Sequence, residues 1–343
     1  MSDSIPAKGQ PEGEPDQGDP PGPPPHDTPM GEPAADGTLV AGGLEPAAGS
    51  IEELEGMSVE SRSFGRQTWD RFRRHRIAMI AAVGLVLMAA SFYVGPTLSP
   101  WAFTDIDPAA IVEPGISVTH PFGADQIGRD LFVRVMKGGQ FSIRIALFVS
   151  LLTTLIGTLI GAFAGYFGGV VDTMISQLIN LFLIVPALII LLVIGARWGA
   201  SPNVIAVLLG LLLWPQIARV VRGLFLQYKE QEFVLAAKAA GARAGRIMFR
   251  HILPNTFGPI VVNATLLIGV AIILESTLSF LGLGVQAPTP TLGTLVADAK
   301  GRMDVNPWPL LFPSFFVVMI SLCVNFLGDG LRDALDPTSR KGH

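Results

Sequence analysis

The sequence predicts an all-α membrane protein with six transmembrane helices, and three observations lead to this fold class. Half of the 343 residues are hydrophobic and only 15% are charged, whereas soluble domains carry about 25% charged residues. Six apolar stretches are long enough to cross a bilayer, which takes roughly 20 residues each. The basic residues are unequally divided between the two sides that these spans define. We expect the spans at 77–97, 142–166, 174–196, 203–223, 259–283 and 309–328.

An acidic, proline-rich segment precedes the first span. Residues 1–60 hold thirteen acidic residues, eleven prolines and a single base, Lys8. Such a segment cannot bury enough apolar surface to offset the entropy lost on ordering, so we expect a disordered cytoplasmic tail. The PPPH run at 23–26 leaves open a ligand for a proline-recognising domain, although we favour a solvated tail. Residues 338–343 should form a short cytoplasmic C-terminal tail.

Residues 61–76 are basic and also contain Phe64, Trp69 and Phe72. This composition is typical of a short helix that lies on anionic lipid at the membrane surface. We therefore assign the segment to anchoring and topology, as an interfacial segment. The six-span domain then occupies residues 77–337.

The basic residues predict the orientation of the spans. With the N-terminus in the cytoplasm, sixteen Lys and Arg beyond residue 60 fall on the cytoplasmic side and seven on the outer side. Cytoplasmic loops carry the excess of Lys and Arg, so both termini are expected inside. Four bases between 129 and 144 fall on the outer side. We expect them on an amphipathic interfacial helix that leads into the second span.

Glycines recur at every fourth residue of the second span. Gly157, Gly161 and Gly165 share one helix face, which lets another backbone approach closely. They predict tight helix packing, either within the bundle or across a dimer. The third and fourth spans carry Pro186 and Pro215, which a span tolerates where neighbouring helices satisfy the backbone.

Glu275 is a carboxylate placed well inside the fifth predicted span. A charge there costs about 3 kcal/mol on insertion scales, so it should face the bundle interior or a water-filled path. The sequence leaves two roles open, one in the translocation pathway and one as a structural hydrogen-bonding group.

The segment 232–255, between the fourth and fifth spans, is predicted to form two short helices. The first opens with an acidic residue, which suits the helix dipole, and presents a small face rich in alanine. A glycine then permits a bend, and a second, arginine-rich helix should end at a proline. The residues that define this segment are Glu232, Ala236, Ala237, Gly241, Leu253 and Pro254.

This segment resembles the cytoplasmic loop in the transmembrane subunits of binding-protein-dependent ABC importers. That loop has the pattern E-A-A, three residues, G, nine residues, I-x-L-P, and the alanine pair, the glycine and Leu-Pro match at the correct spacing. Two positions depart, because Leu235 stands where the pattern has Glu and His251 where it has Ile. Three further runs are similar to the peptide-permease branch: RHILPN at 250–255, HPFGADQIGRD at 120–130 and NFLGDGLRDALDP at 325–337.

The resemblance implies a permease of the type I ABC importer kind, in which Glu232–Gly241 is the coupling helix. Such a subunit forms half of a translocation pathway in the cell membrane, together with a second, paralogous permease. Two ATP-binding subunits hydrolyse ATP with Mg, so this chain would bind no cofactor and would be no enzyme. An extracytoplasmic solute-binding protein would deliver oligopeptides or dipeptides.

Two alternatives remain open at this point. Related permeases carry nickel or another small solute. A self-sufficient secondary transporter or membrane enzyme would need several intramembrane charges or a catalytic cluster, and Glu275 alone supplies neither.

Other chemistries find no support in the residues. The sequence has no G-x4-G-K-[ST] run to cradle phosphates. Its five histidines lack the spacing of metal ligands, so we predict no metal site. Cys323 is the only cysteine and has no intrachain partner. No pattern indicates a nucleic-acid partner.

Overall fold

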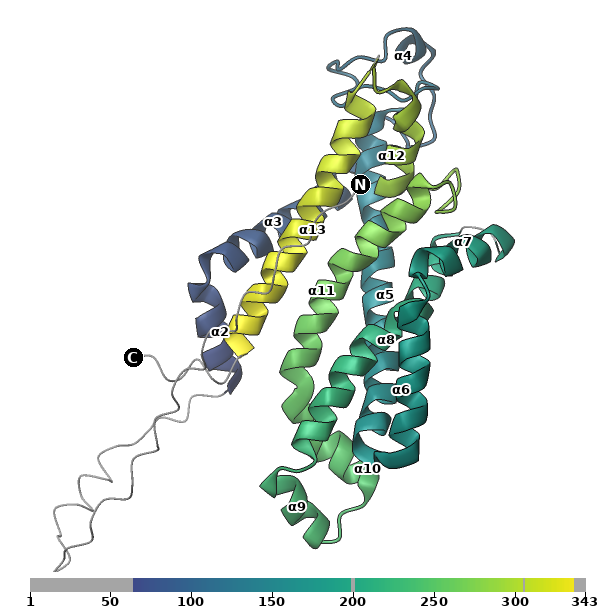
Figure 1. Cartoon of the computed structure of the whole chain (residues 1–343). Helices are drawn as coiled ribbons and strands as arrows, with labels where there is room; N and C mark the ends of the chain where they lie inside the picture. Colours follow the sequence, from purple (N-terminus) through teal and green to yellow (C-terminus); the bar gives the residue numbers. More distant parts are fainter. Residues whose placement is uncertain (1–63, 199–200, 305, 336–343) are drawn as a thin grey trace, which may run out of the picture. The chain divides into compact units, whose positions relative to one another are not determined.

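Five helices are long and apolar enough to cross a membrane among residues 64–198, 201–304 and 306–335, which the computed structural model describes. They are α3 (Arg76–Leu98), α5 (Leu131–Phe167), α8 (Pro202–Tyr228), the continuous helix Ala244–Phe280, and α13 (Trp308–Leu335) (Figure 1). The continuous helix consists of α10 (Ala244–Arg246), a π-helical turn (Ile247–Ile252) and α11 (Leu253–Phe280). The shorter helices are α2 (Phe64–Arg74), α4 (Pro108–Val112), α6 (Gly169–Ile184), α7 (Ala187–Trp198), α9 (Glu232–Ala239), α12 (Leu292–Ala299) and a 3-10 turn (Lys300–Arg302).

The predicted third span, 174–196, is not a single helix. The chain forms α6 and α7 instead, with a break at Val185 and Pro186. The proline ring fixes its own φ and disfavours the helical conformation of the residue before it. Figure 1 shows α7 turned away from the axis of α6. The other five predicted spans are confirmed.

The glycine face of α5 packs directly against α8. A Cβ atom at Gly157, Gly161 or Gly165 would lie 2.8, 2.5 or 2.6 Å from a backbone carbonyl oxygen of α8. Those carbonyls belong to Trp214, Ala218 and Arg222. The tight packing expected of these glycines is therefore found inside one chain, between the two helices with the most extensive contact in the bundle.

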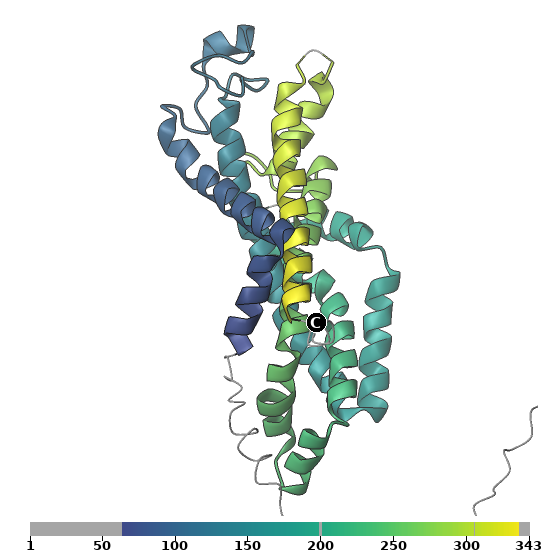
Figure 2. The same ribbon diagram turned by 90° about the vertical axis from the view of Figure 1, so that its left-hand side faces the viewer.

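The core joins α3, α5, α8, α11, α12 and α13. It contains one fully buried side chain or more from each long helix, for example Phe92, Val135, Leu209, Ile272 and Ile320. Figure 2 shows α13 (yellow) running beside α3 (blue), and the two helices are in extensive contact.

The basic segment ends in α2, which is attached to the base of α3 and α13. Phe72 is buried against Ala78 and Ala334. His75 caps α3 by accepting a hydrogen bond from the Ala78 amide at 3.1 Å, and its other nitrogen lies 3.4 Å from a carboxylate oxygen of Asp333. The tails at 1–60 and 338–343 lie outside the described residues.

The helix expected around residues 129–144 is continuous with the second span. Together they form α5, a single helix of 37 residues that begins at Leu131. Its first turns are buried, and Arg134 is 4% exposed because its charge is paired with Asp125 in the preceding loop. Asp125 thus pairs with Arg129 and Arg134 inside the protein.

Candidate functional site

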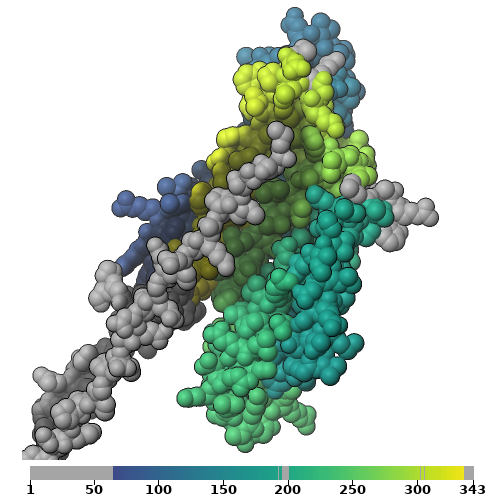
Figure 3. All heavy atoms as spheres, viewed as in Figure 1, coloured from purple at the N-terminus to yellow at the C-terminus, as the bar shows by residue number. Residues whose placement is uncertain are grey.

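The α9 helix is held at one end of the bundle by an inward-facing valine. Val234 is fully buried against Ile247, Met248 and Ile252 of the π-helical turn. The helix begins at Glu232, as predicted, with Gln231 as its cap. In the space-filling view the α9–α10 segment projects at the lower end of the bundle (Figure 3).

The opposite face of α9 is exposed and mostly apolar, with Glu232 at its start. Phe233 is 40% and Leu235 47% exposed, and Ala236 and Ala240 are also exposed, while Ala237 is half-buried. A short helix with one anchored face and one bare apolar face is suited to insertion into a groove on another protein.

Gly241 ends α9 in a left-handed conformation, with φ of 78°. The Ala242 amide donates to the Ala237 carbonyl at 3.0 Å, and the Gly241 amide donates to the Lys238 carbonyl at 2.9 Å. This pair of bonds is the Schellman motif, which favours glycine at this position. The bend predicted at Gly241 is therefore confirmed.

The second short helix does not end at Leu253–Pro254, contrary to the sequence prediction. Residues Ala244–Phe280 form one continuous helix. The π-helical turn places the Leu253 amide on the Met248 carbonyl. Pro254, which has no amide to donate, follows Leu253 directly after this turn. The bend after α9 is thus connected to a membrane span without a break.

Glu275 lies near the far end of this continuous helix. From Ala244 the helix rises roughly 45 Å to reach it, at 1.5 Å per residue. Its side chain is 1% exposed and accepts hydrogen bonds from Ser142 on α5, Ser279 on α11 and Thr291 before α12. The carboxylate therefore faces the bundle interior, one of the two surroundings expected for it, and is enclosed by hydroxyl groups.

The loop 99–130, at the same end as Glu275, is organised around a buried histidine. His120 contacts Asp130 at 2.7 Å through Nδ1 and Asp107 at 3.2 Å through Nε2. Both aspartates also cap helices, Asp107 at α4 and Asp130 at α5. Only the protonated imidazolium can donate both bonds. Burial alone would lower the pKa of His120, but the hydrogen bonds and charges of Asp130 and Asp107 outweigh it and raise the pKa.

This loop should lose stability as the pH rises. Because the pKa of folded His120 lies above its ordinary value near 6.5, the stabilisation is complete below that value and is lost as pH increases through the folded pKa. Asp107 and Asp130 are the charged groups that face it. Thermal unfolding of the detergent-solubilised chain between pH 5.5 and 9 should show a falling midpoint, and His120→Gln should flatten the curve. An equal slope in both proteins would contradict this assignment.

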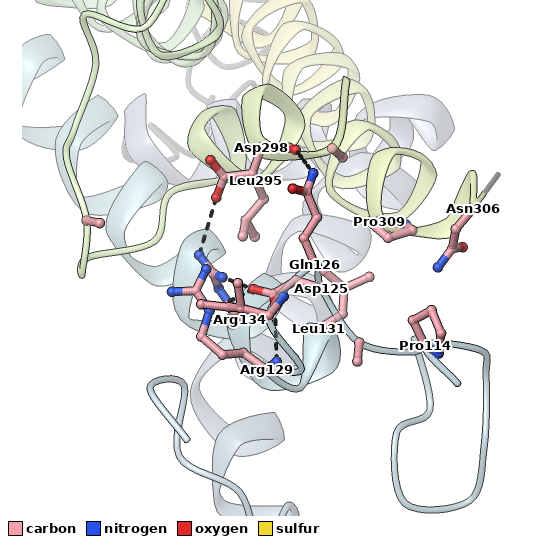
Figure 4. Close-up of a pocket in the computed structure, with 14 residues that line it drawn as sticks. Pro114, Asp125, Gln126, Arg129, Leu131, Arg134, Leu295, Asp298, Asn306 and Pro309 are labelled. Carbon is pink, nitrogen blue, oxygen red and sulfur yellow. Dashed lines mark hydrogen bonds and ion pairs between the residues drawn. The ribbon is translucent and has the colours of Figure 1, made fainter. Parts of the chain in front are cut away.

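A cavity of about 400 Å³ lies between this loop and α12 (Figure 4). Asp125 accepts from the Arg129 Nε at 2.7 Å and also binds the Arg134 guanidinium, which lies 3.5 Å from Asp298. Burial opposes ionisation of Asp125, but the amides and arginines lower its pKa, whereas burial raises the pKa of Asp298. The cavity is lined by Pro114, Ala124, Asp125, Gln126, Ile127, Arg129, Leu131, Arg134, Ala287, Leu295, Asp298, Ala299, Asn306 and Pro309.

The sequence alone did not predict the hydrogen bonds and ion pairs of the loop 99–130, or the partners of Glu275. The run at 120–130 indicated a resemblance, and it also supplies His120, Asp125 and Asp130 to the networks. Ser279 lies four residues from Glu275 on the same helix, but Ser142 and Thr291 are 133 and 16 residues away, so spacing gives no signal for these two hydroxyls.

The comparisons with known proteins agree with this arrangement. The family "Binding-protein-dependent transport system inner membrane component" matches residues 157–341, and "N-terminal TM domain of oligopeptide transport permease C" matches residues 63–114. The chain is 42% identical over 287 residues to the oligopeptide transport system permease protein OppC of Escherichia coli (strain K12), covering 83% of this chain and 95% of that protein.

Two further relatives extend this comparison. The Bacillus subtilis (strain 168) OppC is 36% identical over 87% of this chain and 97% of its own length. The dipeptide transport system permease protein DppC of Alkalihalophilus pseudofirmus is 36% identical over 79% of this chain and 89% of its own length. With its apolar helices, this chain is a multi-pass membrane protein. It belongs to the family of inner membrane components of binding-protein-dependent transport systems.

Proposed function

We propose that this chain is a permease subunit of an ATP-driven importer of peptides. The observation that carries the proposal is the α9–α11 unit, in which an exposed apolar helix is joined through one bend and a continuous helix to the membrane bundle. The names of the relatives, which are oligopeptide and dipeptide permeases, support peptides as the solute.

In this proposal α9 lies in the cytoplasm and inserts into a groove on an ATP-binding subunit. The excess of Lys and Arg on the side of α9 supports this orientation, with both termini in the cytoplasm. The loop 99–130 and α12 then lie outside, where a solute-binding protein would dock. A second, paralogous permease would supply the other half of the pathway, and two ATP-binding subunits would hydrolyse ATP with Mg.

Coupling follows from the continuity of the α9–α11 unit. ATP binding would close the pair of ATP-binding subunits and displace α9. Because Val234 fixes α9 to the π-helical turn, that displacement would move α11 within the bundle. A rigid movement of this kind is a known means of alternating access.

Uptake by the reconstituted importer tests the proposal. Proteoliposomes that contain this chain and its co-purified subunits should accumulate a labelled oligopeptide only with ATP and a solute-loaded binding protein. The matched control has the same subunits and a non-hydrolysable ATP analogue. Uptake driven by an ion gradient in vesicles that contain this chain alone would overturn the proposal in favour of a secondary transporter.

A further inference from the structure

We infer that Glu275 is a positioning residue that ties the start of α12 to α5 and α11, and so couples the loop 99–130 to the α9–α11 unit. The hydrogen bonds of Glu275 belong to this chain alone, whereas their consequence for transport rests on the proposed function. The sequence left open whether Glu275 serves the pathway or a structural bond, and the geometry points to a bond with a mechanical role.

Three hydroxyl groups from three different segments converge on the carboxylate. Thr291 Oγ1 donates to Oε1 at 2.7 Å, Ser279 Oγ donates to the same oxygen at 2.9 Å, and Ser142 Oγ donates to Oε2 at 3.3 Å. A hydrogen bond to a carboxyl group that is buried away from water is costly to leave unmade. Glu275 therefore joins α5, α11 and the residue that caps α12.

The same hydroxyls accept bonds from the first amides of α12. The Leu292 amide donates to Ser142 Oγ at 3.1 Å, and the Thr294 amide donates to Thr291 Oγ1 at 3.2 Å. Amides in the first turn of a helix lack partners within the helix and carry partial positive charge. Two hydroxyls thus connect Glu275 to the first turn of α12 and hold that end of the helix in place.

The start of α12 packs closely against the backbones of α5 and α11. A Cβ at Gly138 of α5 would lie 3.1 Å from the carbonyl carbon of Thr291, and one at Gly293 would lie 2.5 Å from the Cα of Ser276 on α11. The start of α12 is therefore in direct contact with α5 and α11. A displacement of this end of α12 would displace these two helices as well.

The other end of α12 is bonded to the loop 99–130. Gln126 Nε2 of the loop donates to the Asp298 carbonyl at 2.7 Å (Figure 4). The Asp298 carboxylate also lies 3.5 Å from the Arg134 guanidinium of α5, which in turn binds Asp125 of the loop.

Because both of its ends are bonded, α12 connects the loop 99–130 to Glu275. A protein that binds to the loop and displaces it would displace α11 through α12. The helix that contains α11 continues to the bend after α9.

Variants that break these bonds measure the energetic coupling directly. The assembled importer, in lipid nanodiscs, would carry Glu275→Ala, Glu275→Gln, Thr291→Val or Thr291→Ser. Thr277→Val is the matched control, since that hydroxyl lies two residues away on α11 and donates to the Ile273 carbonyl of its own helix.

Two quantities are measured on each variant: hydrogen exchange of the α12 amides, and the ratio of ATPase rates with and without solute-loaded binding protein. In Glu275→Ala and Thr291→Val, α12 exchange should rise by about tenfold, the size expected when a buried polar group loses its hydrogen-bond partner. The stimulation ratio should fall in the same variants. Glu275→Gln and Thr291→Ser should keep both values, because an amide can accept from Thr291 and donate to Ser142, and serine retains the hydroxyl.

The outcomes separate this inference from the proposed function. Wild-type α12 protection in Glu275→Ala would overturn the positioning role. Unchanged α12 protection with equal loss of stimulation in Glu275→Gln and Glu275→Ala would overturn it too, and would indicate that the charge acts on the solute. Absence of stimulation in the wild type would contradict the proposed function, while the exchange data would still decide whether Glu275 holds α12. If Glu275→Ala is not assembled, Ser279→Ala provides the test, because it removes one donor to Glu275 and leaves the Thr291 cap of α12 intact.

Discussion

Replacement of Gly161 by leucine is expected to prevent α5 from packing on α8, so that little assembled protein is recovered from the membrane. A Cβ at this position would lie 2.5 Å from the carbonyl oxygen of Ala218 and 3.0 Å from the Cβ of Val221. Neither neighbour is the flexible end of a side chain, so the two helices would have to separate. Overpacking of a core typically costs about 1–3 kcal/mol, occasionally more, and here the contact is between backbones.

The measurement is the yield of monodisperse complex and its thermal unfolding midpoint. Gly161→Ala should already lower both, and Gly161→Leu should lower them further. Gly223→Ala is the control, because a Cβ added to this glycine of α8 would meet no neighbouring heavy atom within 4 Å, and alanine is the better helix former. Wild-type yield and midpoint in Gly161→Leu would show that α5 and α8 do not pack in the membrane as described.

Replacement of Gly241 by valine is expected to block transport while the chain remains in the membrane. The residue has φ of 78° and nothing within 4 Å of a Cβ, so the defect would be conformational and not a clash with a neighbour. A left-handed conformation costs an L-residue about 1–2 kcal/mol, and a β-branched residue more. Such a cost changes the population of the bent loop by roughly 5–30-fold.

Solute uptake and co-purification of the ATP-binding subunits are the two readouts. Gly241→Val should lose most uptake, whereas Gly241→Asn should keep much of it, because asparagine tolerates left-handed backbone. Normal uptake by a normally assembled Gly241→Val importer would remove the bend from the mechanism.

Five of the six predicted spans could be found from apolar length alone, since a stretch that crosses hydrocarbon must be long and nearly free of charge. Whether a helix breaks at a proline could not be predicted. Both Pro186 and Pro254 follow the same local rule, yet the helix breaks at Pro186 and continues past Pro254. The difference lies in tertiary contacts, because Ile247, Met248 and Ile252 are buried and hold the π-helical turn before Pro254 in place.

The bend at Gly241 could be predicted from the sequence because the conformational freedom of glycine is a local property. The surroundings of Glu275 were not, since Ser142 and Thr291 are remote in sequence and only the fold brings them to the carboxylate. Arg134 is a similar case. Its charge suggested a lipid interface, but Asp125 satisfies it inside the protein.

Site-specific photo-crosslinking from α9 tests the central claim most directly. Benzoylphenylalanine would replace Phe233, which is 40% exposed on α9, and in a control Phe315, which is 56% exposed on α13. In the assembled importer, irradiation should link position 233 to an ATP-binding subunit, and position 315 should give no such product. An intact complex in which position 233 gives no link to an ATP-binding subunit would contradict the role of α9 as the coupling helix.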